Sequence, residues 1–165
     1  MSASIETAEF GNPPSHHRLW RYGPLVVWAL LIFSASTNVF SAANTSRFVT
    51  PLLQWLYPQI SAATIDFIHG VIIRKGAHLT EYALFALLAA RAFRTSSHEL
   101  LWRHWFIFSV LLVVVYSLGD EFHQSFVPSR TASIYDSTID SFGGLIALGF
   151  VAFRGWLAPA ASRQS

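Results

Sequence analysis

The sequence predicts an all-α integral membrane bundle of four transmembrane helices. Apolar residues make up 53% of the 165-residue chain and charged residues only 12%, which is about half of the roughly 25% charge that a soluble domain carries. Four apolar stretches each approach the roughly 20 residues that a helix needs to cross about 30 Å of hydrocarbon. Most of the six tryptophans lie near the ends of these stretches, as in the aromatic belts of membrane proteins.

The four predicted spans are taken in chain order. Their approximate bounds are residues 22–40, 77–93, 105–119 and 134–153. Polar termini at 1–17 and 158–165 are predicted to be disordered tails, so the transmembrane domain covers 18–157. A cleavable signal peptide is the alternative for the first stretch, because small residues follow it at Ser41. An uncleaved span is preferred, because the stretch is long enough to cross and the preceding tail is long for a signal peptide.

The connection between the first two spans is predicted to contain a short interfacial segment. Pro51 and Pro58 bracket an amphipathic stretch that suits the surface of a bilayer. Thr64 is the expected N-cap of a helix leading into the second span. Gly70 and Gly76 predict a bend where that helix enters the membrane.

Two polar blocks interrupt the apolar pattern. The first is residues 74–82, and the second is residues 120–130, which Asp136 and Asp140 follow. Ionisable groups near hydrocarbon cost roughly 2.5–3.5 kcal/mol each on insertion scales, so they need partners and commonly mark functional sites. The second span starts in the first block, and the third span ends in the second block. Because consecutive spans run antiparallel, both blocks are expected at the same end of the bundle.

Helical spacing places the polar residues of each block on common faces. Residues three and four apart share one side of a helix, and small residues at Gly143, Gly144 and Ala147 allow close helix approach beneath the acids. The predicted catalytic residues, as general acids or bases, are His78, Glu81, Asp120 and Glu121. The predicted substrate-binding residues are Arg74, Lys75, Tyr82, Gln124, Arg130, Asp136 and Asp140.

Other interpretations of the polar blocks stay open. In a structural clasp, Arg74 and Arg130 would pair with the acids and join the loops to the bundle. A divalent metal ion is a further alternative, because the i, i+3 spacing of His78 and Glu81 occurs in metal-binding helices; the metal and any other cofactor remain unassigned. No motif surrounds the hydroxyl candidates Ser125, Ser129 and Thr131, which disfavours a serine mechanism.

Composition excludes some classes of function. The chain has no cysteine, so it has neither disulfides nor a thiolate zinc site. A net charge of +2 is too small to indicate a nucleic-acid partner. The expected partners are the lipid bilayer and a lipid-linked or cell-wall ligand.

The two polar blocks resemble the VanZ-like family of small bacterial membrane proteins, over residues 72–149. The matching residues are Arg74, Lys75, His78, Glu81, Tyr82, Asp120, Glu121, Gln124, Phe126, Pro128, Arg130, Asp136 and Gly143. Ser129 and Asp140 stand where the family pattern usually has Gly and Asn, and residues 33–36 are a loose version of its Ser-rich first-span end. The resemblance implies a four-span protein and a link to resistance against glycopeptide antibiotics, teicoplanin in particular.

Three functions compete on this basis. The first is an enzyme or binder acting on a lipid-linked or envelope substrate. The second is a non-catalytic accessory protein with a structural polar clasp. The third is a small proton-coupled carrier, which is disfavoured because a carrier needs polar groups near the bilayer midplane and these lie at one end.

The distribution of basic residues predicts a cell-membrane protein with both termini in the cytoplasm. Seven Lys or Arg residues lie on the side of the termini and four lie on the other side, and basic loops stay inside. A topology reporter fused after Arg94 should therefore give a cytoplasmic signal, and one fused after Ser133 an external signal. An external signal after Arg94 would reverse the orientation and place the polar blocks at the cytoplasmic face.

Overall fold

The computed structural model describes residues 15–37, 42–127 and 133–157, and all of its regular elements within these ranges are helical. This confirms the all-α class. The elements in order are α1 (Ser15–Ala35), α2 (Ala42–Leu56), α3 (Ala62–Phe67), the π-helical segment η2 (Ile68–Ile73), α4 (Arg74–Arg94), α5 (Glu99–Arg103), α6 (Trp105–Gln124) and α7 (Ile134–Leu157).

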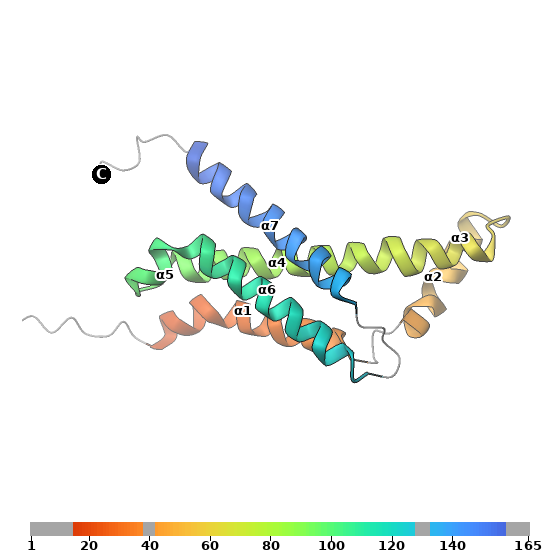
Figure 1. The fold of residues 1–165 in the computed structure, drawn as a ribbon. Helices are drawn as coiled ribbons and strands as arrows, with labels where there is room; N and C mark the ends of the chain where they lie inside the picture. Colours follow the sequence, from red (N-terminus) through yellow and green to blue (C-terminus); the bar gives the residue numbers. More distant parts are fainter. Residues whose placement is uncertain (1–14, 38–41, 128–132, 158–165) are drawn as a thin grey trace, which may run out of the picture.

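Four long helices form the bundle, and α4 is its central member. Helix α4 contacts α1, α6 and α7, and in Figure 1 α6 and α7 run obliquely to α4, with the C-terminal end of α7 diverging from it. Helices α2 and α3 lie beyond one end of the bundle, whereas α5 lies at the opposite end (Figure 1). The helices therefore alternate in direction, as the sequence predicted, and both polar blocks fall at the end nearer to α2.

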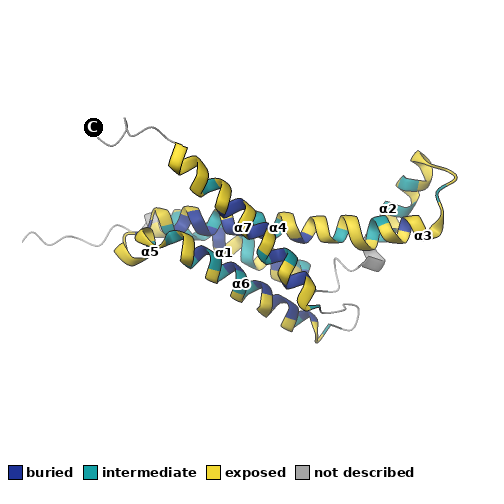
Figure 2. Ribbon diagram, turned by 45° about the horizontal axis from the view of Figure 1, so that its top comes forward, coloured by how far each residue is buried: buried dark blue, intermediate teal, exposed yellow. Residues whose placement is uncertain are grey.

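Many large apolar residues of the bundle are exposed, and its buried residues include small and polar side chains beside apolar ones. Figure 2 shows the buried faces of the long helices turned toward one another. On α6, Ile107, Leu111 and Val115 are exposed while Ser109 and Ser117 are fully buried. A soluble protein rarely exposes so much contiguous apolar surface, and small or hydroxyl residues at helix contacts are typical of membrane proteins. Helices α6 and α7 are long and apolar enough to cross a membrane by length and composition.

Helix α1 begins earlier and ends earlier than the predicted span. It starts at Ser15, inside the predicted tail, and ends at Ala35. Two hydrogen bonds dock α1 on its neighbours: the Trp28 indole Nε1 donates to the Glu81 carbonyl at 2.9 Å, and the Tyr116 hydroxyl donates to the Ala29 carbonyl at 2.6 Å.

The connection to the second span is more helical than the sequence predicted. Helix α2 spans 15 residues and includes Pro51, so it is not confined between the prolines. Ser61, rather than Thr64, caps α3, since its Oγ accepts a hydrogen bond from the Thr64 N–H at 3.1 Å. The chain then continues through η2 into α4 without a break, so the bend expected at the two glycines is replaced by a π-helical segment, which adds a residue per turn while keeping the helix intact.

Helices α6 and α7 are both longer than the sequence predicted. Helix α6 runs five residues past its predicted end, to Gln124, so Asp120 and Glu121 lie on the helix and not in a loop. Helix α7 runs four residues past its predicted end, to Leu157. The short helix α5 between α4 and α6 was not predicted.

The predicted close contact of small residues is confirmed between α4 and α7. A Cβ atom placed on Gly143 would lie 2.5 Å from the Leu79 carbonyl oxygen, and one on Gly144 would lie 2.8 Å from Val113 Cγ1. At Gly143 the obstacle is backbone, which cannot rotate away. Helix α7 therefore approaches α4 as closely as it does because residue 143 has no side chain.

We expect Gly143→Ala to destabilise the protein by ~1–3 kcal/mol, the usual cost of overpacking. Gly149→Ala is the matched control on the same helix, because its Cβ would meet no atom within 4 Å and alanine has the higher helix propensity. Thermal unfolding in detergent should therefore show a lower Tm for Gly143→Ala only. Equal Tm values for both variants would contradict the close backbone contact.

Candidate functional site

The candidate site lies where α1 and α6 end and α7 begins, beside the first turns of α4. Its polar side chains are buried although they belong to charged or amide residues. They are His78, Asp120, Glu121, Gln124, Asp136 and Asp140. All of them were predicted from the polar blocks, and the structure brings them to one end of the bundle.

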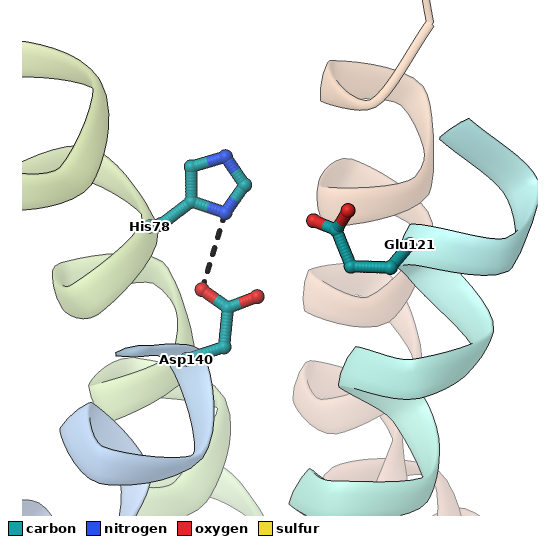
Figure 3. A group of neighbouring side chains, drawn as sticks. All are labelled: His78, Glu121 and Asp140. Carbon is teal, nitrogen blue, oxygen red and sulfur yellow. Dashed lines mark hydrogen bonds and ion pairs between the residues drawn. The ribbon is translucent and has the colours of Figure 1, made fainter. Parts of the chain in front are cut away.

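The centre of the site is an interhelical pair with a third carboxylate facing it. His78 Nδ1 on α4 lies 3.1 Å from Asp140 Oδ1 on α7. The Glu121 carboxylate on α6 points toward this pair (Figure 3), and its Oε2 accepts a hydrogen bond from the Ser133 backbone N–H at 2.7 Å. The site thus combines an imidazole with two carboxylates from three different helices.

Asp120 is held by neutral donors next to this centre. The Ser36 hydroxyl donates to Asp120 Oδ1 at 2.5 Å, and the Gln124 amide Nε2 donates to Oδ2 at 3.0 Å. Ser36 was not among the predicted site residues. The sequence feature that could have identified Ser36 is the Ser-rich end of the first apolar run, because that end lies at the same end of the bundle as the acids.

An ion pair closes the outer edge of the site. Arg74 Nη2 on α4 lies 3.1 Å from Asp136 Oδ2 on α7, and these side chains are 28% and 12% exposed. This is one of the pairings that the structural clasp predicted. It stabilises the same α4–α7 contact as the His78–Asp140 pair does.

An aromatic layer separates the site from the rest of the bundle. The Phe85 and Tyr116 rings lie 4.8 Å apart, and Tyr82 lies 6.2 Å from Phe85 and 6.4 Å from Tyr116 between ring centroids. Tyr82 is fully buried. These rings pack against the apolar core of the bundle.

Several buried polar atoms of the site have no hydrogen-bond partner within the described residues. They are Glu121 Oε1, His123 Nε2, Gln124 Oε1 and Asp140 Oδ2. An unpaired buried polar atom costs about 1–3 kcal/mol, and folded proteins contain few of them. Their concentration in one place indicates a site built to interact with water, an ion or a substrate.

A cleft on the outside of the bundle reaches this site between α1 and α6. Its volume is about 290 Å³. It is lined by Phe33, Leu112, Val115, Tyr116, Gly119, Asp120 and His123. The lining is mostly apolar, Phe33 and Val115 are themselves exposed, and its ionisable residues are Asp120, His123 and Tyr116.

Some predicted site residues lie apart from this centre. The structure groups His78 with Asp140 and Glu121, not with Glu81, whose side chain is half-buried and whose backbone carbonyl accepts the Trp28 hydrogen bond. Lys75 is exposed. Arg130, together with Ser129 and Thr131, lies outside the described residues, and the Ser125 hydroxyl donates to the Phe122 carbonyl.

Comparison with known proteins agrees with the resemblance seen in the polar blocks. A family model described as VanZ/LLP1 matches residues 22–155, which contain every buried polar residue of the site. No curated protein and no solved structure matches the chain.

The Arg74–Asp136 pair provides a test of the clasp. Arg74→Gln leaves a mostly buried carboxylate without its charged partner, so we expect the free energy of unfolding to fall by ~1–3 kcal/mol. Arg103→Gln is the control, because its pairing with Glu99 is exposed and long, at 3.8 Å, and exposed pairs contribute little. Thermal unfolding of both variants in detergent measures the difference, and an unchanged Tm for Arg74→Gln would show that the pair is not a clasp.

Proposed function

Because the chain belongs to the VanZ/LLP1 family, we propose that it is a multi-pass protein of the bacterial cell membrane that binds, or acts on, a lipid-linked substrate of the cell envelope. In this proposal α1, α4, α6 and α7 cross the membrane with both termini in the cytoplasm. The polar site then faces the cell-wall side, where lipid-linked wall precursors are found.

The observation that carries this proposal is the cleft between α1 and α6. A lipid-linked substrate has a long hydrocarbon chain and a polar head. The cleft offers apolar walls at Phe33, Leu112 and Val115, and it ends at Asp120 and His123. Because the surrounding helix surface is apolar, a chain can enter the cleft from the bilayer without crossing water.

The end of the bundle that the cleft reaches carries both acidic and basic side chains, which can contact a polar head group. Asp120 lies in the cleft, and Glu121 of the His78 centre is the next residue of α6. His78 and Glu121 can exchange protons with a bound head group as general acid and base. Arg74 and Lys75 lie at the same end of the bundle and attract phosphate groups.

The family resemblance implies a link to glycopeptide resistance, and the proposed location agrees with it. Glycopeptides act at the outer face of the membrane, on wall precursors that carry a lipid anchor. A protein that binds such precursors there changes their availability. We therefore extend the proposal to reduced susceptibility to glycopeptides such as teicoplanin.

The accessory-protein alternative also has observations in its favour. The Arg74–Asp136 pair and the Ser36–Asp120 hydrogen bond join helices as a purely structural clasp would. A carrier acting alone is disfavoured, because the buried charged residues gather at one end of the bundle and not at its middle.

A cleft-filling variant tests the proposal. Gly119→Leu places an apolar side chain in the cleft, and its Cβ would meet no atom within 4 Å, so folding should be preserved. Excluding about two methylenes of a lipid chain loses ~0.8 kcal/mol each, so binding of undecaprenyl phosphate to the purified protein should weaken about tenfold. Native mass spectrometry of the detergent-solubilised protein measures this binding.

The matched control is Gly149→Leu on α7, whose Cβ also meets open space but which does not line the cleft. It should bind as the wild type does. Teicoplanin susceptibility of a host expressing each protein should follow the same order. Equal lipid affinity of Gly119→Leu and wild type would exclude the cleft as the lipid site. A wild-type protein that neither binds the lipid nor alters susceptibility would leave the accessory role in its place.

A further inference from the structure

Three side chains that can bind a metal ion converge from three helices. His78 of α4, Glu121 of α6 and Asp140 of α7 each offer one ligand atom, and these atoms all lie within 4.8 Å of one another. Figure 3 shows both acidic side chains directed toward the imidazole. Two donor atoms about 2.1 Å from one ion are at most about 4.2 Å apart, so a small inward shift of the side chains completes the set.

The two carboxylates each keep one oxygen for an additional partner. Glu121 uses Oε2 to accept the Ser133 N–H, and Asp140 uses Oδ1 for His78. Their other oxygens, Glu121 Oε1 and Asp140 Oδ2, are buried and have no hydrogen-bond partner among the described residues. These side chains are 6% and 0% exposed as residues, so bulk water does not readily satisfy them.

The charge of the trio matches a divalent cation. Two carboxylates and a neutral imidazole together carry a charge of −2, and a buried charge is costly unless it is compensated. The Arg74 guanidinium is paired with the separate carboxylate of Asp136, and Lys75 is exposed. A divalent ion bound between these three side chains would neutralise their charge of −2.

The surrounding contacts are also those that metal ligands commonly have. The Ser133 N–H orients the Glu121 carboxylate, in the way that hydrogen bonds from outside the ligand set fix ligating side chains. The close α4–α7 approach at Gly143 holds the helices that carry His78 and Asp140. The positions of two of the three ligands are therefore set by backbone contact and not by flexible loops.

We propose that His78, Glu121 and Asp140 bind a first-row divalent transition-metal ion of the Zn²⁺ or Mn²⁺ class. An imidazole with two carboxylates suits these ions, whereas Ca²⁺ and Mg²⁺ prefer oxygen ligands alone. Three protein ligands leave at least one coordination position for water or a substrate, as in catalytic metal sites. This proposal does not depend on the lipid cleft and can be tested without a lipid.

Metal content of the purified full-length protein tests this site. The protein carries an affinity tag without histidine, is stripped with a chelator, and is titrated with Zn²⁺ and separately with Mn²⁺. We expect about one bound equivalent by mass spectrometry of the metal, together with a rise in Tm on metal addition. A wild-type protein that binds neither ion above the detergent background would overturn the proposal, whatever the variants do.

Ligand variants locate the ion within the chain. Asp140→Asn and Glu121→Gln keep the side-chain shape and remove one ligand charge each. Affinity should fall at least about 100-fold, because loss of even an outer partner commonly costs roughly 10–100-fold, and the rise in Tm on metal addition should vanish. His98→Ala is the matched control, since this histidine is exposed near α5 at the other end of the bundle. A loss of binding in His98→Ala, with the two acidic variants still binding, would place the ion elsewhere.

Discussion

The close contact between α4 and α7 at Gly143 is the constraint on which the polar site depends. Helices surrounded by lipid gain little from burying apolar surface, so they associate through tight packing and hydrogen bonds. Gly143 faces Leu79, the residue after His78, and Asp140 lies one helical turn before Gly143. The backbone approach and the His78–Asp140 hydrogen bond are therefore parts of one contact. Gly144 makes a similar close contact with Val113 of α6. This contact packs α6, which carries Glu121, against the helix that carries Asp140.

Two kinds of polar group share this end of the bundle, and they have different roles in the fold. The Arg74–Asp136 pair joins α4 to α7, and the Ser36 hydroxyl, which follows α1, donates to Asp120 of α6. In contrast, Glu121 and Asp140 each retain an unpaired buried oxygen. Satisfied groups stabilise the helix contacts, whereas unpaired ones add a cost that a bound ion or substrate offsets. The contacts that join the helices and the carboxylates with unpaired oxygens are therefore different groups that lie next to one another.

The position of Asp120 and Glu121 as neighbours on α6 connects the two proposals. Consecutive residues of an α-helix point about 100° apart, so Asp120 reaches the cleft at α1 while Glu121 faces the His78–Asp140 pair. A head group bound at the end of the cleft would therefore lie next to the three proposed metal ligands. The rings of Tyr82, Phe85 and Tyr116 pack next to this centre, and Tyr116 also lines the cleft.

Apolar composition and helical periodicity determined the helical class and the order of the four long helices, because these depend only on local sequence. They also placed the polar residues at one end and identified Gly143 as a contact residue. Which side chains meet could not be read from spacing, since His78 has Glu81 on its own helix face but pairs with Asp140 of α7. Nor did the sequence show that Ser36 would bind Asp120 or that η2 would continue into α4. Those outcomes depend on how closely the helices approach and rotate about their axes, and only the packed tertiary structure decides that.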